Sequence, residues 1–64
     1  MDTIAEIIKG YRNKKGWTQE RFALLLAIDQ TMVSKLETGV AEPGKKLALK
    51  LALLTEQPLE MFIR

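Results

Sequence analysis

Apolar residues recur at helical spacing along the chain, and this spacing constrains the fold more than any other feature. Ile4, Ile7, Ile8 and Tyr11 begin the series, at intervals that place side chains on one face of a helix. No stretch of useful length alternates between apolar and polar residues, as a half-buried strand would. The sequence therefore predicts an all-α protein.

Capping residues divide the pattern into helices. Thr3 and Glu6 have the spacing of a capping box, and Gly16 suits the left-handed residue that ends the first helix. Thr18 is a good N-cap for a second helix, which stops near Ala27. Further helices are expected over residues 30–38, 44–55 and 58–63, the last with Pro58 in its first turn. The expected fold is a compact five-helix bundle, with residues 1–64 forming one domain.

The composition argues against catalysis and against metal binding. The 64 residues include no cysteine and no histidine, so disulfides, thiolate sites and imidazole ligands are excluded. Ser34 has no base partner in sight, and the four glycines are scattered along the chain instead of forming a phosphate loop. We expect no catalytic residue, no metal, no cofactor and no small-molecule ligand.

Two groups of basic residues stand out although the formal net charge is only +2. They comprise Lys9, Arg12, Lys14 and Lys15 in the first, and Lys45, Lys46 and Lys50 in the second. Each group is either a solvated helix end or a surface that contacts phosphates, and charge alone favours the solvated helix end.

The sequence shows no sign of a membrane segment or a signal peptide. An acidic residue follows the first methionine, and Glu6 and Lys9 interrupt the first apolar stretch. The most apolar run, LALKLALL, is too short to span a bilayer. We expect a cytoplasmic protein.

Residues 19–36, QERFALLLAIDQTMVSKL, are the most informative stretch. Two short helices joined by so few residues must cross steeply, which requires small residues where their backbones approach. Ala23 and Ala27 meet this requirement. Apolar side chains suited to fill the angle between the helices are Phe22, Leu26, Ile28, Val33 and Leu36.

The predicted helix over residues 30–38 has one polar face without an acid. At about 100° per residue, five polar side chains fall within an arc of about 140°. They are Gln30, Thr31, Ser34, Lys35 and Thr38, while Met32, Val33 and Leu36 lie on the other side. Such donors and acceptors can read base edges, whereas an ordinary solvated face would include Glu or Asp. Asp29 lies at the N-cap, where we expect backbone N–H groups to bind its carboxylate.

These residues resemble a known family. The segments TQERFA and IDQTMVSKLETG are similar to the helix-turn-helix signature of phage repressors and Cro proteins, the xenobiotic-response-element type, also called lambda-repressor-like. The resemblance covers nearly the whole chain and places the motif at about residues 18–38. The chain departs from it in two places. Ala27 stands where glycine is usual, and Thr55, Glu56 and Gln57 stand where the family tends towards leucine, glycine and valine.

The resemblance implies a role for individual residues. Gln19 matches a position that bonds a DNA phosphate and braces the recognition helix, and Thr18 precedes it. Base contacts are implied for Gln30, Thr31 and Lys35, with Ser34 and Thr38 on the same face. Phosphate contacts are expected from Lys14, Lys15, Lys45 and Lys46. Arg12 and Glu37 match a pair that forms a salt bridge in many members; the alternative is two independent surface charges.

Surplus leucines suggest self-association. Leu49 and Leu53 are expected on the outer face of the fourth helix, and Met61, Phe62 and Ile63 follow. Not all five fit into a core this small, so they form the predicted homodimer interface.

The function expected from the sequence is binding of double-stranded DNA in the major groove, as a small repressor or Cro-like autoregulator on a palindromic operator. The alternative is a protein-interaction module, such as an antitoxin-like partner, whose DNA binding is secondary. Surplus apolar surface, which includes Leu24, supports that alternative.

Overall fold

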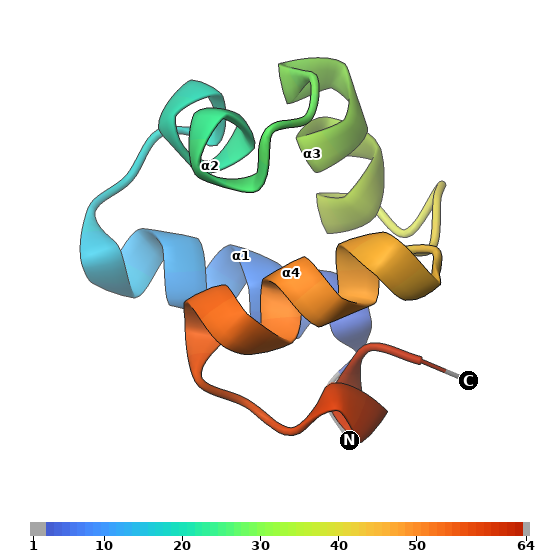
Figure 1. Cartoon of the computed structure of the whole chain (residues 1–64). Helices are drawn as coiled ribbons and strands as arrows, with labels where there is room; N and C mark the ends of the chain where they lie inside the picture. The colour runs from blue at the N-terminus through green and yellow to red at the C-terminus, as the bar shows by residue number, and fades with distance from the viewer. Residues whose placement is uncertain (1–2, 64) are drawn as a thin grey trace.

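The computed structural model describes residues 3–63, which form four α-helices and one 3-10 turn (Figure 1). The elements are α1 (Ile4–Lys15), α2 (Gln19–Leu26), α3 (Gln30–Glu37), α4 (Lys45–Thr55) and η1 (Leu59–Met61). The all-α prediction is confirmed. The predicted fifth helix over 58–63 is wrong, because only a single 3-10 turn forms there.

Three helices end at a residue in the left-handed conformation. These residues are Gly16, Ala27 and Glu56, with φ of 72°, 57° and 57°. In each case the N–H of the next residue donates to a carbonyl five residues earlier, at N···O distances of 3.1, 3.0 and 3.2 Å. This bond closes the helix end and stabilises the reversal. Ala27 and Glu56 therefore occupy the two positions where the resemblance expects glycine, which places residues 55–57 in register with the family pattern.

Two of the three predicted N-caps form side-chain hydrogen bonds. Thr3 Oγ1 accepts from the Glu6 amide at 3.2 Å, and Thr18 Oγ1 accepts from the Arg21 amide at 3.0 Å. Asp29 occupies the N-cap position of α3, but its carboxylate makes no capping bond, contrary to our prediction. The Met32 amide, which such a side chain would bind, donates to the backbone carbonyl of Asp29 instead, at 3.0 Å.

The core lies where the four helices meet. Its buried side chains are Ile8, Phe22, Ala23, Leu26, Val33, Leu36, Ala48, Leu51 and Phe62. Tyr11 and Trp17 extend it at one edge, where the Tyr11 and Trp17 rings lie 5.9 Å apart between centroids. The Tyr11 hydroxyl also donates to the carbonyl of Leu54 at 3.1 Å, so this edge ties α1 to α4.

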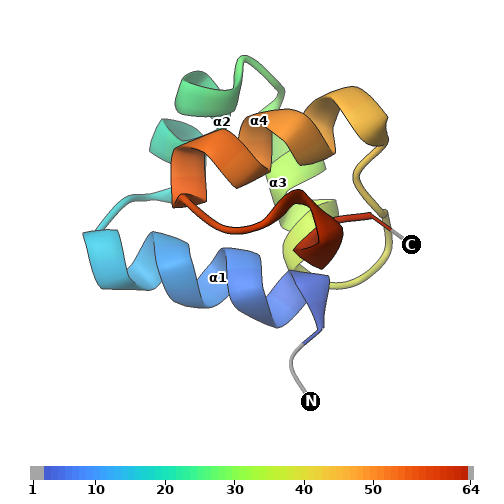
Figure 2. The same ribbon diagram turned by 60° about the horizontal axis from the view of Figure 1, so that its bottom comes forward.

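Phe62 is only 1% exposed, which corrects its predicted place on a dimer surface. A turn of three residues has no stability of its own. Packing of the Phe62 side chain into the core therefore holds η1 in place, between α1 and α4 in Figure 2.

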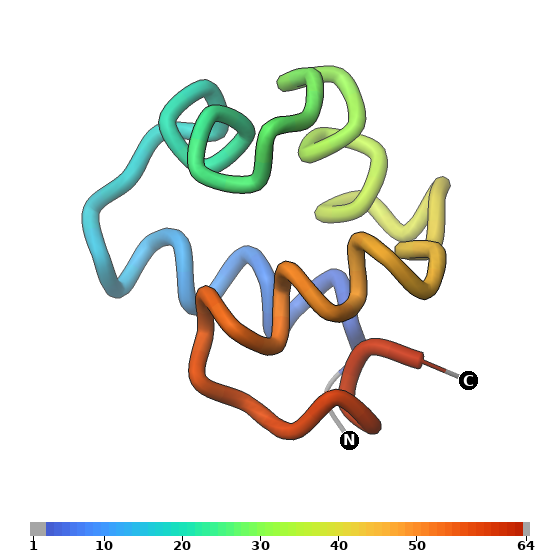
Figure 3. Tube along the Cα trace, viewed as in Figure 1, coloured from blue at the N-terminus to red at the C-terminus, as the bar shows by residue number. Residues whose placement is uncertain are grey.

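The helix-turn-helix pair lies on one side of the molecule. In the trace of Figure 3, α2 and α3 are joined by a short turn and cross steeply, far from both chain ends. The α3 helix packs against α2 and α1, while α4 packs against α2 and η1. One face of α3 is thereby left uncovered.

A buried ion pair fixes the end of α3. Arg12 Nε donates to Glu37 Oε2 at 2.6 Å and Arg12 Nη2 donates to Glu37 Oε1 at 3.0 Å, so the predicted salt bridge forms with two bonds. Arg12 Nη1 donates to the Trp17 carbonyl at 2.8 Å. The side chains of Arg12 and Glu37 are 13% and 3% exposed. Hydrogen bonding to Glu37 raises the pKa of Arg12, against the opposing effect of burial, so Arg12 stays charged at any ordinary pH.

We predict that Arg12→Ala lowers the free energy of unfolding by roughly 3 kcal/mol, because the Glu37 carboxylate would remain buried without its cation. Urea denaturation followed by circular dichroism measures this change. The matched control is Arg21→Ala, on the exposed surface of α2, which should alter stability by less than about 0.5 kcal/mol.

A double variant, Arg12→Met with Glu37→Met, separates pairing from simple loss of a side chain. It should recover most of the stability, since no unpaired charge remains buried. Equal stabilities for Arg12→Ala and Arg21→Ala would show that the pair contributes nothing.

Candidate nucleic-acid interface

The uncovered face of α3 carries the polar residues that the sequence placed there. Gln30, Thr31 and Lys35 are exposed, and their side chains form no hydrogen bond or ion pair with other described residues. Ser34 is half-buried on the same helix. The Thr38 hydroxyl donates to the carbonyls of Ser34 and Lys35, at 3.0 and 3.2 Å, so it acts mainly as a C-cap and retains only acceptor capacity.

The other face of α3 is buried, with one exception. Val33 and Leu36 belong to the core, as predicted. Met32 was expected beside them but is 37% exposed. Its side chain lines an apolar groove together with Leu47 of α4.

The start of α2 lies beside the end of α3. Gln19 Nε2 donates to Glu37 Oε1 at 3.3 Å, so Gln19 braces α3 through the carboxylate that Arg12 also holds. Thr18 is exposed, and its hydroxyl oxygen already caps the helix. The first amides of a helix have no intrahelical partner, so this end of α2 presents donors suited to an anion.

Four exposed lysines flank the helix pair. Lys14 and Lys15 end α1, and Lys45 and Lys46 begin α4, two helix ends that lie on opposite sides in Figure 1. Lys45 and Lys46 stand in a first turn without any acidic residue, where the helix dipole disfavours cations. A nearby anion would offset this repulsion.

Lys50 does not belong with Lys45 and Lys46. Its Nζ donates to the carbonyl of Leu26, the last residue of α2, at 3.2 Å. Proximity in the sequence grouped the three lysines and did not reveal this contact. Helical spacing contained the signal, because residue 50 lies three residues after Leu47 and four before Leu54, both on the inner side of α4.

The five residues predicted at the dimer interface differ in exposure. Leu53 is 81% exposed, and Leu49, one turn earlier on α4, is exposed as well. Met61 and Ile63 are exposed beyond α4. With Phe62 in the core, four of the five predicted residues remain at the surface.

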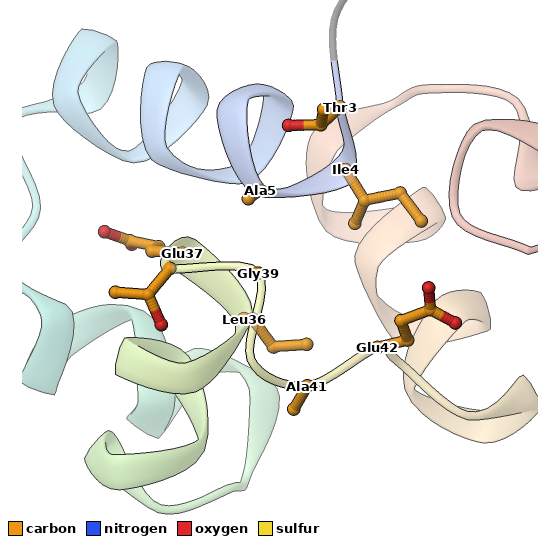
Figure 4. Close-up of a pocket in the computed structure, with 9 residues that line it drawn as sticks. Thr3, Ile4, Ala5, Leu36, Glu37, Gly39, Ala41 and Glu42 are labelled. Carbon is orange, nitrogen blue, oxygen red and sulfur yellow. The ribbon is translucent and has the colours of Figure 1, made fainter.

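A hollow between the start of α1 and the end of α3 is lined by side chains that are already engaged (Figure 4). The Thr3 hydroxyl donates to Glu6 at 3.1 Å, and Glu37 accepts from Arg12 and Gln19. Within residues 3–63 no three acidic side chains come together as metal ligands. No helix among these residues is long and apolar enough to cross a membrane.

Comparisons with known proteins agree with this arrangement. A family model described as helix-turn-helix matches residues 8–62. No curated protein and no solved structure matches the chain. Residues 8–62 include all of α2, α3 and α4, and membership implies DNA binding and transcriptional regulation without enzymatic activity. The chain therefore belongs to the helix-turn-helix family of the repressor and Cro type.

Proposed function

We propose that the protein is a small transcriptional repressor or autoregulator that reads a palindromic operator in the cytoplasm of a prokaryotic cell or a phage-infected host. The observation that carries this proposal is the acid-free polar face of α3, where Gln30, Thr31 and Lys35 have no partner among the described residues. Exposed donors and acceptors on a braced helix, which no other described residue occupies, are available to bond base edges.

DNA phosphates on both sides of the major groove are the proposed partners of the basic helix ends. Lys14 and Lys15 lie at one end of the helix pair, and Lys45 and Lys46 at the other. The start of α2, with Thr18 and Gln19, supplies a third contact to the backbone. Contacts on both sides would hold α3 in the major groove without contributing sequence information themselves.

Two copies are needed for sufficient affinity, because one domain of this size contacts few bases. In the proposed homodimer, the outer face of α4 meets its counterpart through Leu49 and Leu53, with Met61 and Ile63 beside them. The two recognition helices would then enter major grooves about 34 Å apart, one turn of DNA.

A protein-interaction role is the second candidate function. The exposed Leu24 favours it, because this side chain lies on α2 rather than on the proposed dimer surface. In that case DNA binding would be secondary to a protein partner, as in antitoxin-like proteins.

The base contacts are tested first. Sequence selection from a random DNA pool supplies the operator. Gln30→Ala and Lys35→Ala should each weaken binding by about 1–3 kcal/mol and relax the preference at one base pair. Fluorescence anisotropy with single-base variants of the operator measures both effects. Gln57→Ala, beyond the end of α4, is the matched control. Wild-type selectivity in both variants would place the recognition face elsewhere.

The phosphate contacts are tested by salt dependence. Lys14→Gln with Lys15→Gln, or Lys45→Gln with Lys46→Gln, should weaken binding to all sequences about equally. The slope of log K against log salt should fall by roughly one unit for each phosphate that a lysine no longer neutralises. Lys9→Gln, in the first half of α1, controls for removal of charge alone. An unchanged slope in both double variants would show that these lysines are only solvated.

The dimer surface is tested by Leu49→Glu with Leu53→Glu. Charges at an apolar seam should give folded monomers in sedimentation equilibrium, with operator affinity reduced by roughly 100-fold because the second binding event no longer occurs. Leu24→Glu is the matched control, since it places the same charge on another exposed leucine. Persistence of the dimer in the double variant would rule out this interface.

A further inference from the structure

An apolar groove runs along the side of the helix-turn-helix where α4 begins. We call it the turn groove, and Leu24 and Ala27 from the end of α2, Ile28 and Met32 around the start of α3, and Leu47 of α4 line it. Asp29 is the charged residue in its wall. The α2 helix packs against α4, which brings Leu47 to the turn groove. The turn groove is separate from the polar face of α3 and from the predicted dimer surface.

The apolar walls are open to solvent. Leu24 is 70% exposed and Met32 is exposed as well, although they lie together in the turn groove. Ala27 adds a methyl group in a left-handed conformation that glycine would adopt without strain. Contiguous exposed apolar side chains on a domain this small indicate a contact surface.

The carboxylate of Asp29 defines the charge of the occupant. It makes no capping hydrogen bond, and it has no ion pair with any residue in the described range 3–63. An exposed carboxylate beside apolar walls attracts a cation. It repels phosphate, so the DNA backbone is a poor occupant of the turn groove.

A second copy of the chain is also a poor occupant. The exposed leucines of α4 would have to enter the turn groove of another molecule. That contact joins two different surfaces, so it would extend into open chains instead of closing a dimer. The turn groove is therefore left for a different protein.

We propose that the turn groove docks a short segment of a partner protein, in which a large apolar side chain stands next to a lysine or arginine. The apolar side chain enters between Leu24 and Met32, and the cation pairs with Asp29. Such a segment would act on the DNA-bound regulator from the side of the turn, without covering the polar face of α3.

Selection of phage-displayed random 12-residue peptides on the wild-type protein tests this proposal. The enriched peptides should share a leucine-sized or aromatic residue adjacent to lysine or arginine. Binding of the synthesised peptides is measured by fluorescence anisotropy. It should weaken at least tenfold in Leu24→Glu, because Leu24 is a main apolar contact in the turn groove. Asp29→Asn should weaken it several-fold and reduce its salt dependence. Val40→Glu, which places the same charge on an exposed apolar residue in the loop after α3, should leave binding unchanged.

Three outcomes would overturn the proposal. The first is that no peptide is enriched, that the enriched peptides contain no lysine or arginine, or that their binding does not change in Leu24→Glu. The second is loss of the dimer in Leu24→Glu by sedimentation, which would place a second copy in the turn groove. The third is loss of operator binding in a folded Leu24→Glu variant, which would place DNA there. Because operator binding and self-association are measured separately, failure of the docking proposal and failure of the proposed repressor function are distinguishable.

Discussion

The ion pair between Arg12 and Glu37 determines where the recognition helix lies. The α3 helix has only eight residues, too few to be stable without tertiary contacts. Val33 and Leu36 anchor its inner face in the core. The carboxylate of Glu37 adds a polar anchor at its end, because it accepts bonds from Arg12 of α1 and from Gln19 of α2. Glu37 thereby links α1, α2 and α3, and these bonds help to hold the polar face of α3 in its orientation.

Short connections are the second constraint, and they require left-handed residues at helix ends. Ala27 and Glu56 adopt this conformation although each side chain costs roughly 1–2 kcal/mol there. The amides of Ile28 and Gln57 compensate by closing the ends of α2 and α4. At Ala27 the strained conformation also sets the steep crossing of α2 and α3. The angle of the helix-turn-helix thus depends on a backbone conformation that the residue type does not favour.

Local patterns in the sequence predicted the helices and the polar face of α3, because helical periodicity and capping act over a few residues. The Arg12–Glu37 pair was reached only through the family resemblance, since the two residues lie 25 positions apart. Contacts between elements explain the errors. Phe62 is buried in the core and only a 3-10 turn forms beside it, Lys50 binds the end of α2, and Met32 faces the turn groove. The pattern within a single helix reveals none of these contacts.

Among residues 3–63, a core of nine buried apolar residues leaves about half of each helix at the surface, so each helix has a second face to use. In α3 that face is polar, whereas in α4 it carries Leu49 and Leu53. A net charge of +2 gives little bulk attraction to DNA, so in the proposed complex the affinity depends on where individual lysines lie and on the proposed second copy. Because the polar face, the outer face of α4 and the turn groove involve different residues, the proposed DNA reading, pairing and partner docking can change independently of one another and of the core.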